Sequence, residues 1–371
     1  MSELEVRPVS SKKEMGEFIR LPWKIYRDNP HWVPPLLLQL KKNLDRKKNP
    51  FFEHSQVEFF LCQDRKEVVG RIAAILNENH NAFHDEKTGF FGFFESVQDF
   101  KVAKSLLDAS SKWVKEKGMN LLRGPTSFST NDECGLLIEG FDSSPMVMMP
   151  YSPRYYLDFM EAYGFVKSKD LLAYVMYRQP LPERLSRSAE LIRKRRGIKL
   201  RSLDLKDFDN EVDRLREIYN SAWEKNWGFV PMTDREFVHM AKDLKSIVDP
   251  DFAIIAEIDG DPVGFSLALP DINQALKKIN GRLLPFGILK LLWYMKKIDA
   301  IRVITLGVKK SYRKLGIEGL FYHETFRRGL EKGYQMGEFS WVLEDNVLMN
   351  RGIENLGAKV YKRYRIYEKK L

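Results

Sequence analysis

The chain has 371 residues, of which 44% are hydrophobic and 30% charged, a balance that excludes a largely disordered protein and is long enough for two globular domains. Its formal net charge of +10 favours anionic partners, yet acidic and basic residues are interspersed and no RRM-type or C2H2-type signature occurs, so nucleic acid is not an expected partner. The only two cysteines, Cys62 and Cys134, give neither a disulfide framework nor metal-ligand spacing, which predicts a reducing compartment and no bound metal.

The first residues of the sequence, 1–7, lack the basic-then-apolar order of a secretory signal. Nor does any apolar run have the length of a membrane span. We therefore expect a cytoplasmic protein.

The first half contains short apolar or alternating runs, which are typical of strands, and segments with apolar residues at helical spacing. Together these patterns predict the order β-α-β-β-β-α-β. The strands are expected at residues 4–9, 57–62, 68–76, 89–94 and 121–123, and the helices at 15–26 and 100–117.

The second half repeats this order, beginning with a strand at 197–201 and a helix at 211–223. A hairpin follows, whose turn at Asp259-Gly-Asp261 is a strong local signal. The remaining elements are expected at 301–308, after Gly316, and at 337–343, 350–356 and 361–367.

The repeat predicts an α/β (α+β) fold with two tandem domains. Each should have a mixed, mostly antiparallel central sheet flanked by helices. We place the domains at residues 1–180 and 197–371, joined by a basic linker or helix at 181–196.

The turn between the strand at 301–308 and the helix after Gly316 has the composition of a phosphate cradle. A glycine lets the backbone approach a ligand closely, and the amides of a helix N-terminus attract anions. Four cations surround the turn: Lys309, Lys310, Arg313 and Lys314. The alternative is a basic strand-to-helix turn without a ligand.

The element order and the turn Arg313-Lys-Leu-Gly316-Ile-Glu318 resemble the GNAT superfamily of N-acyltransferases, which holds the pyrophosphate of acyl-CoA on an Arg/Gln-x-x-Gly-x-Gly/Ala turn. The resemblance implies acyl-CoA or acetyl-CoA as co-substrate and no metal. Glu318 departs from the pattern, because a carboxylate beside a pyrophosphate repels it unless its side chain points away; it equally suits a helix dipole. The first half lacks such a turn, so only the second is expected to hold CoA. The cofactor-binding residues are expected to be Leu306, Val308, Arg313, Lys314, Leu315, Gly316, Ile317 and Asn346.

Motifs along nearly the whole chain resemble a bacterial family of paired GNAT-like proteins that includes the bacterial ceramide synthases. The motifs are Trp32-Val-Pro-Pro35, Lys48-Asn-Pro-Phe-Phe-Glu-His54, Val69-Gly-Arg-Ile-Ala-Ala74, Gly124-Pro-Thr-Ser127, Gly135-Leu-Leu-Ile-Glu-Gly-Phe-Asp142, Met149-Pro-Tyr-Ser-Pro-Arg-Tyr-Tyr156, Asn226-Trp-Gly-Phe229 and Tyr364-Arg-Ile-Tyr367. The resemblance implies acyl transfer from a thioester to an amine, with a long-chain (sphingoid-type) base as one acceptor. Two alternatives stay open: a Fem-type transferase that uses aminoacyl-tRNA, and a non-catalytic GNAT-like binding or scaffold protein.

Acyl transfer to an amine needs a base, donors for the oxyanion and an acid for the leaving thiolate. Backbone amides of the strand at 303–308 are the expected oxyanion donors. GNAT proteins often use as acid a tyrosine four residues before the glycine that ends the last helix, but Ile353 stands there. The candidate catalytic residues are Glu224, Asp345 and His323, each of which also has a structural interpretation, and Asn346 also suits a helix cap.

Aromatic residues in two loops are the candidates for substrate binding. They are Trp227 and Phe229 in the second half and Tyr151 and Tyr155 in the first, where a loop rich in tyrosine is expected to line a cleft.

The segment 282–297 combines apolar side chains with Trp293, Tyr294 and flanking basic residues. It is too short to span a bilayer but suits an interfacial segment or the lid of a lipid-sized pocket. It predicts peripheral contact with the inner face of the membrane and a lipid acceptor; a packed surface helix is the alternative.

Overall fold

The computed structural model describes residues 4–181, 183–224 and 226–371. They form two compact units that are not consecutive in sequence. The first comprises Met1–Leu171, Leu276–Leu291 and Lys362–Leu371, and the second comprises Leu172–Ala275 and Leu292–Tyr361.

The first unit has a mixed sheet in which β1 to β4 pair in antiparallel fashion and β4 pairs with β5 in parallel. The strands are β1 (Leu4–Pro8), β2 (Ser55–Asp64), β3 (Glu67–Asn77), β4 (Thr88–Ser96), β5 (Leu121–Gly124) and β6 (Leu136–Glu139). The helices are α1 (Lys12–Ile25), α2 (Leu37–Asn43), α3 (Glu78–His84), α4 (Phe100–Glu116) and α5 (Tyr156–Tyr163).

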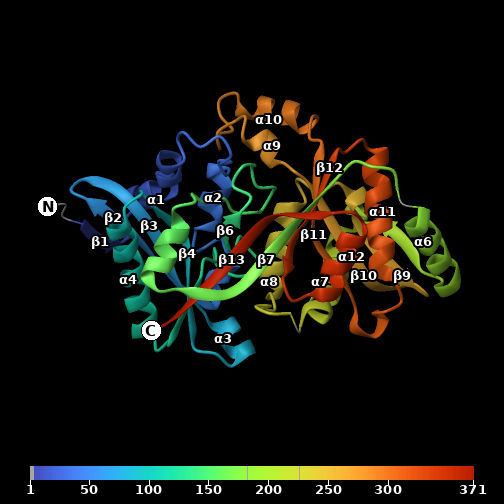
Figure 1. Ribbon diagram of the computed structural model, residues 1–371, viewed down its shortest axis with the longest axis horizontal. Helices are drawn as coiled ribbons and strands as arrows, with labels where there is room; N and C mark the ends of the chain where they lie inside the picture. Colours follow the sequence, from blue (N-terminus) through green and yellow to red (C-terminus); the bar gives the residue numbers. More distant parts are fainter. Residues whose placement is uncertain (1–3, 182, 225) are drawn as a thin grey trace. The chain divides into compact units, whose positions relative to one another are not determined.

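Alternate residues of β2 and β3 pack on opposite helices, because successive strand side chains point to opposite faces. Phe59 and Ala73 lie in the cluster with Phe18 of α1, whereas Phe60 and Ile72 lie with the buried face of α4. The sheet is thus covered by α1 on one face and α4 on the other (Figure 1).

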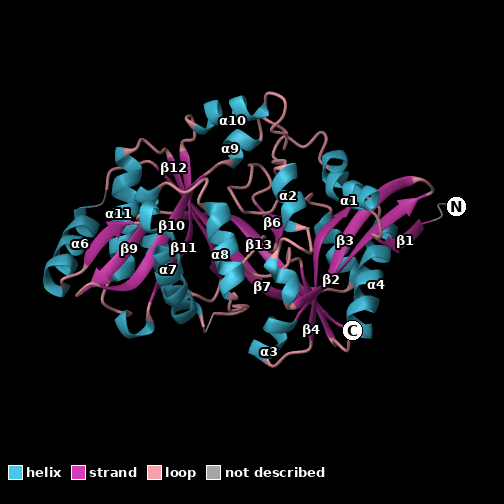
Figure 2. Ribbon diagram, turned by 180° about the vertical axis from the view of Figure 1, so that it is seen from behind, coloured by secondary structure: helices cyan, strands magenta, loops and turns pink. Residues whose placement is uncertain are grey.

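The second unit repeats the arrangement with β8 (Lys199–Ser202), β9 (Ala253–Ile258), β10 (Asp261–Pro270), β11 (Ala300–Val308) and β12 (Met336–Leu343). Its helices are α6 (Glu183–Arg196), α7 (Phe208–Trp223), α8 (Asp234–Leu244), α9 (Asn273–Leu276), α10 (Gly287–Met295), α11 (Ile317–Glu331) and α12 (Val347–Asn355). Ile255 packs with α7 and Ile254 with α11 and α6, so these helices cover opposite faces of the sheet (Figure 2). Two of these helices cross the boundary between the units: Leu276 of α9 and the part of α10 up to Leu291 belong to the first unit.

Two long strands belong to both units. β7 (Val166–Tyr177) passes from the first unit into the second after Leu171, and β13 (Lys359–Lys370) passes back at Lys362. In the first unit β13 pairs with β5, with Tyr367 opposite Gly124. The C-terminal strand therefore completes the sheet of the N-terminal unit.

The predicted element order and mixed α/β class are confirmed for the elements that the sequence indicated. The structure adds α2, α3, β6, α5, α8 and α9, which were not predicted from the sequence. The basic stretch 181–196 contains α6, one of the two forms expected for it. The sequential boundaries at 180 and 197 stay predictions. In the described part of the chain, no helix has both the length and the apolar character that crossing a membrane requires.

Candidate acyl-CoA site and buried polar clusters

The central strand of the second unit diverges from its parallel neighbour. β11 pairs with β12 only from Ala300 to Val303, which lies opposite Phe339, yet β11 continues to Val308. A register shift against β10 falls at the same level. The backbone of β11 beyond Val303 is therefore outside the β11–β12 ladder, which is the place the sequence assigned to the oxyanion donors.

The turn after β11 requires glycine. Gly316 has φ of 85° and precedes the first turn of α11, and its Cβ substituent would come 2.7 Å from Cδ1 of Ile192. No side chain caps the N-terminus of α11 from this position. Gly316 itself therefore supplies no capping oxygen to the first amides of α11, and the N-terminus of a helix suits an anion.

The cations of this turn differ in their contacts. Arg313 donates to the carbonyl oxygens of Val308, at 3.4 Å, and Ala222. Lys309 pairs with Glu217. The side chains of Lys310 and Lys314 are exposed. Two of the four cations thus brace the turn against the strand and α7, and two extend into solvent beside it.

Glu318 lies in the first turn of α11 and is half-buried. Burial, and then the Glu318 charge, raise the pKa of Tyr322 well above its usual value. Tyr322 packs on Phe339 with ring centroids 5.7 Å apart and shares a cluster with Ile353. Tyr322 is therefore a buried, neutral phenol close to the residue that replaces the family's acid, and periodicity alone gave no reason to choose it over other helix residues.

The structure separates the candidate catalytic residues. Glu224 is exposed at the C-cap of α7. His323 is half-buried on α11, where burial lowers its pKa and the charge of Arg193 from α6 adds to the lowering. Since α7 and α6 cover opposite faces, Glu224 and His323 lie on opposite sides of the sheet. Asp345 is exposed just before α12.

Asn346 is the N-cap of α12, with its side-chain oxygen accepting from the Met349 amide at 3.3 Å. Phe229 is buried and lies 5.7 Å from the Tyr219 ring, while Trp227 is half-buried. A substrate role for these residues stays a prediction.

The strand of the first unit that corresponds to β11 is β4, and the carboxyl group of Glu95 lies near its end. The hydroxyls of Tyr26 and Tyr156 donate to Oε2 of Glu95, at 2.9 and 2.8 Å, and Arg71 lies 3.8 Å from Oε1. Burial raises the pKa of Glu95 to about 7, although Arg71 and the phenols act in the opposite direction. A carboxyl that changes charge near neutrality is a functional candidate that sequence spacing did not reveal.

Two tyrosine hydroxyls form hydrogen bonds with the backbone at the end of this strand. The Ser96 amide donates to the Tyr156 hydroxyl at 2.8 Å, and the Tyr155 hydroxyl donates to the Ser96 carbonyl at 2.8 Å. Tyr151 donates instead to the Phe141 carbonyl at 3.0 Å. Tyr151 and Tyr155 therefore bond within the first unit.

The two central strands end in the same way. β4 pairs in parallel with β5 only from Thr88 to Phe90 and continues to Ser96. Ser96 lies opposite Gly70, as Val308 lies opposite Gly264. Tyrosine hydroxyls bond to the amide and the carbonyl of Ser96. That only the second unit holds a cofactor stays a prediction.

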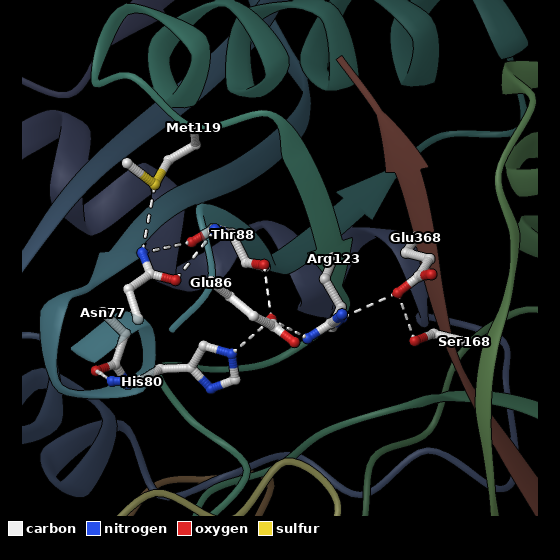
Figure 3. A network of polar contacts seen from close by, with 9 residues as sticks. Asn77, His80, Glu86, Thr88, Met119, Arg123, Ser168 and Glu368 are labelled. Carbon is white, nitrogen blue, oxygen red and sulfur yellow. Dashed lines mark hydrogen bonds and ion pairs between the residues drawn. The ribbon is translucent and has the colours of Figure 1, made fainter. Parts of the chain in front are cut away.

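A second polar network ties the strands of the first unit together. Figure 3 shows Arg123 between the carboxylates of Glu86 and Glu368, at 2.9 and 3.1 Å. Glu86 also contacts His80, at 3.2 Å. His80 is buried, and this desolvation lowers its pKa to about 4. The neutral ring therefore serves as a hydrogen-bond partner within a structural network.

Among the described residues no group of three or more histidines, cysteines or acidic residues is arranged to hold a metal ion. No protein-family model matches the chain.

The chain is 37% identical to a protein named bacterial ceramide synthase from Caulobacter vibrioides over 381 residues, which cover 100% of this chain and 98% of the relative. The chain belongs to the bacterial ceramide synthase family. Another relative with 37% identity, Protein YghO of Escherichia coli, aligns over 99% of this chain and 95% of its own length.

Among solved structures, a tandem GNAT protein from the clavulanic acid biosynthesis pathway aligns with a TM-score of 0.59, 12% identity, and coverage of 99% of this chain and 98% of that one. This likeness confirms the predicted fold of two tandem GNAT-like domains. Together with membership of the bacterial ceramide synthase family, it supports the N-acyltransferase class.

Proposed function

We propose that this protein is an acyl-CoA-dependent N-acyltransferase that joins a fatty acyl group to the amine of a long-chain, sphingoid-type base. The observation that carries the proposal is the Gly316 turn at the open end of β11, in a chain alike over its full length to a protein named bacterial ceramide synthase. We further propose a cytoplasmic location, consistent with two buried free cysteines.

The second unit supplies the acyl-donor site in this proposal. The amides at the N-terminus of α11 would bind the pyrophosphate, with Lys310 and Lys314 beside them. Backbone amides of β11 beyond Val303 would polarise the thioester carbonyl and stabilise its oxyanion. Glu318 lies in the same first turn, so in this proposal its side chain points along the helix towards Tyr322, whose pKa its charge raises, and away from the pyrophosphate.

The reaction proceeds by attack of the neutral amine on the carbonyl carbon. A C–N bond forms, the C–S bond breaks, and the proton lost by nitrogen goes to a base while the thiolate acquires a proton. We propose that the Tyr322 hydroxyl, which keeps its proton because its pKa is raised, donates a hydrogen bond to the developing thiolate, and that the thiolate takes its proton from water. Glu224 and Asp345 are the exposed carboxylates proposed as bases, whereas the surroundings of His323 favour packing.

The acyl chain needs an apolar surface near the thioester. Val347 and Leu348, the first residues of α12, are exposed. They follow the end of β12, the strand that diverges from β11. We propose that this pair contacts the acyl chain.

The test is the thermal unfolding midpoint with CoA and with a medium-chain acyl-CoA below its micelle concentration. A ligand at about 100 times its Kd adds about 2.7 kcal/mol of stability, which raises the midpoint by several degrees. Gly316→Ala should abolish most of this rise, because its Cβ clashes with Ile192 and its φ is positive. Gly260→Ala is the matched control: φ is 89° but no atom lies within 4 Å of the new Cβ, so it should keep the ligand-induced rise.

The outcomes separate the remaining functions. A rise in the wild type and in Gly260→Ala but not in Gly316→Ala supports the donor site. No rise with either ligand refutes the donor site. Binding of aminoacyl-tRNA in a gel-shift assay would then favour a Fem-type transferase. If neither acyl-CoA nor aminoacyl-tRNA binds, a non-catalytic protein is favoured.

A further inference from the structure

The helix α10 and the residues before it form the most apolar exposed segment of the described chain. No residue of α10 is buried. The exposed large apolar side chains of this segment are Leu284, Phe286, Ile288, Leu289, Leu292 and Trp293. Leu284 is 80% exposed and Leu289 66%. An apolar surface of this kind marks an interaction site rather than ordinary solvent exposure.

Apolar residues cover two sides of α10. Ile288, Leu289, Leu292 and Trp293 are one, three and four residues apart, which places them on a single face, and that face is exposed. Leu291 and Tyr294 lie on the opposite face, Met295 lies between the two faces, and all three are half-buried. The helix therefore already uses one apolar face within the protein and presents a second one outward.

Every side chain of this segment that is charged at neutral pH is a cation. The residues from 282 to 297 include Arg282, Lys290, Lys296 and Lys297 and no aspartate or glutamate. The Nζ atom of Lys297 lies 3.6 Å from the centre of the Trp293 ring. Aromatic rings and basic groups bordering an apolar face are the composition of segments that lie at a membrane interface.

Both ends of the segment are anchored by short contacts. The Trp23 indole donates to Asn280 at 2.9 Å, and the Leu37 amide donates to the Gly281 carbonyl at 3.1 Å. At the other end, Gln274 donates to Asp299 at 2.9 Å. The apolar face is thus carried by a segment of defined conformation and not by a loose loop.

We propose that residues 282–297 dock the protein on a bilayer that contains anionic phospholipids. The outward face of α10 enters the boundary between headgroups and acyl chains, and the four cations pair with lipid phosphates. A second copy of this chain fits less well, because pairing two such segments brings eight cations together. The reason for such docking rests on the proposed function, because the long-chain base and fatty acyl group of the proposed reaction reside in membranes.

The test is flotation of the full-length protein with vesicles of phosphatidylcholine alone and with about 30% phosphatidylglycerol, without acyl-CoA. We expect binding to the anionic vesicles that weakens at high salt. Lys296→Gln combined with Lys297→Gln should weaken binding about 30-fold, since each cation near the surface contributes about 1 kcal/mol. Leu289→Glu should abolish it. Leu38→Glu changes a leucine on α2 that is 70% exposed and should bind as the wild type does.

Three outcomes overturn the proposal: no wild-type binding to anionic vesicles, unchanged binding of Leu289→Glu, or a concentration-dependent dimer in sedimentation velocity that Leu289→Glu abolishes, which would assign the face to a second copy. The CoA-induced rise in unfolding midpoint is measured on the same variants. It should persist in Leu289→Glu, so failure of membrane docking and failure of the acyl-CoA site are distinguishable.

Discussion

The charge state of Glu95 should change the pH dependence of stability of the first unit, and Glu95→Gln isolates it. Glutamine can still accept hydrogen bonds from Tyr26 and Tyr156 but cannot ionise in this range. The folded-state pKa of Glu95 is raised from 4.5 to about 7. The folded unit therefore binds more protons than the unfolded chain between these values, and its stability falls as pH rises through the window.

His80 has the opposite effect. Its pKa is lowered from 6.5 to about 4, so the unfolded chain binds the proton first and stability falls as pH drops. When the pH falls from about 7 to about 5, the shifted pKa of Glu95 raises the free energy of unfolding by about 2 kcal/mol, and that of His80 lowers it by about 2 kcal/mol. These two contributions nearly cancel in the wild type.

We therefore expect Glu95→Gln to lose about 2 kcal/mol, relative to wild type, on going from about pH 7 to about pH 5. His80→Gln should gain a similar amount, and the double variant should follow the wild type. The assay is native-state hydrogen exchange of peptides from β3 and β4, corrected for intrinsic rates, because it reads the first unit even when the units unfold separately. The reasoning fails if Glu95→Gln and the wild type have the same difference between the two pH values.

Three further changes test other parts of the structure. Tyr322→Phe should lower kcat of acyl transfer about 100-fold with little change in the Kd for CoA measured by calorimetry; an unchanged kcat would remove Tyr322 as the hydrogen-bond donor to the thiolate. Leu348→Ala should lower kcat/KM for long acyl chains about tenfold and leave acetyl transfer unchanged, the loss expected for a few buried methylenes; equal effects on both donors would contradict the acyl-chain contact. Arg123→Met leaves two carboxylates without their shared partner and should lower the free energy of unfolding of the first unit in urea by about 3 kcal/mol. The control Lys112→Met removes only an exposed ion pair and should lower it by less than about 0.5 kcal/mol. Equal losses in the two variants would refute the role of the network.

The periodicity of the sequence was enough to predict the repeated order, because each strand and helix carries its own apolar pattern. The turn at Gly316 was also predictable, since a glycine between a buried strand and a helix limits the backbone in a known way. That β7 and β13 each have residues in both units could not be predicted, because strands that pair with partners far apart in sequence carry no local signal of the pairing.

The buried cluster of Glu95 escaped prediction for a related reason. Its four members come from α5, β3, β4 and the end of α1, and each looks unremarkable in its own segment. The loop tyrosines did attract notice as exposed rings, yet the Tyr155 hydroxyl bonds to the backbone of Ser96. Composition marks a residue as interesting but does not say whether its polar group faces a ligand or a neighbouring carbonyl.

A single strand position explains how one repeated fold can have two different ends. Counting back from Ser96 and Val308, Glu95 corresponds to Gly307. A Cβ at Gly307 would lie 2.1 Å from the Trp223 ring at the end of α7, whereas Glu95 receives the hydroxyl of Tyr26, just after α1. The first unit thus places a carboxyl and two phenols where the second keeps only backbone and an indole. Because the buried polar groups of the first unit are matched to one another, we expect its strand end to contribute to stability, and the open end of β11 to remain available for the acyl donor.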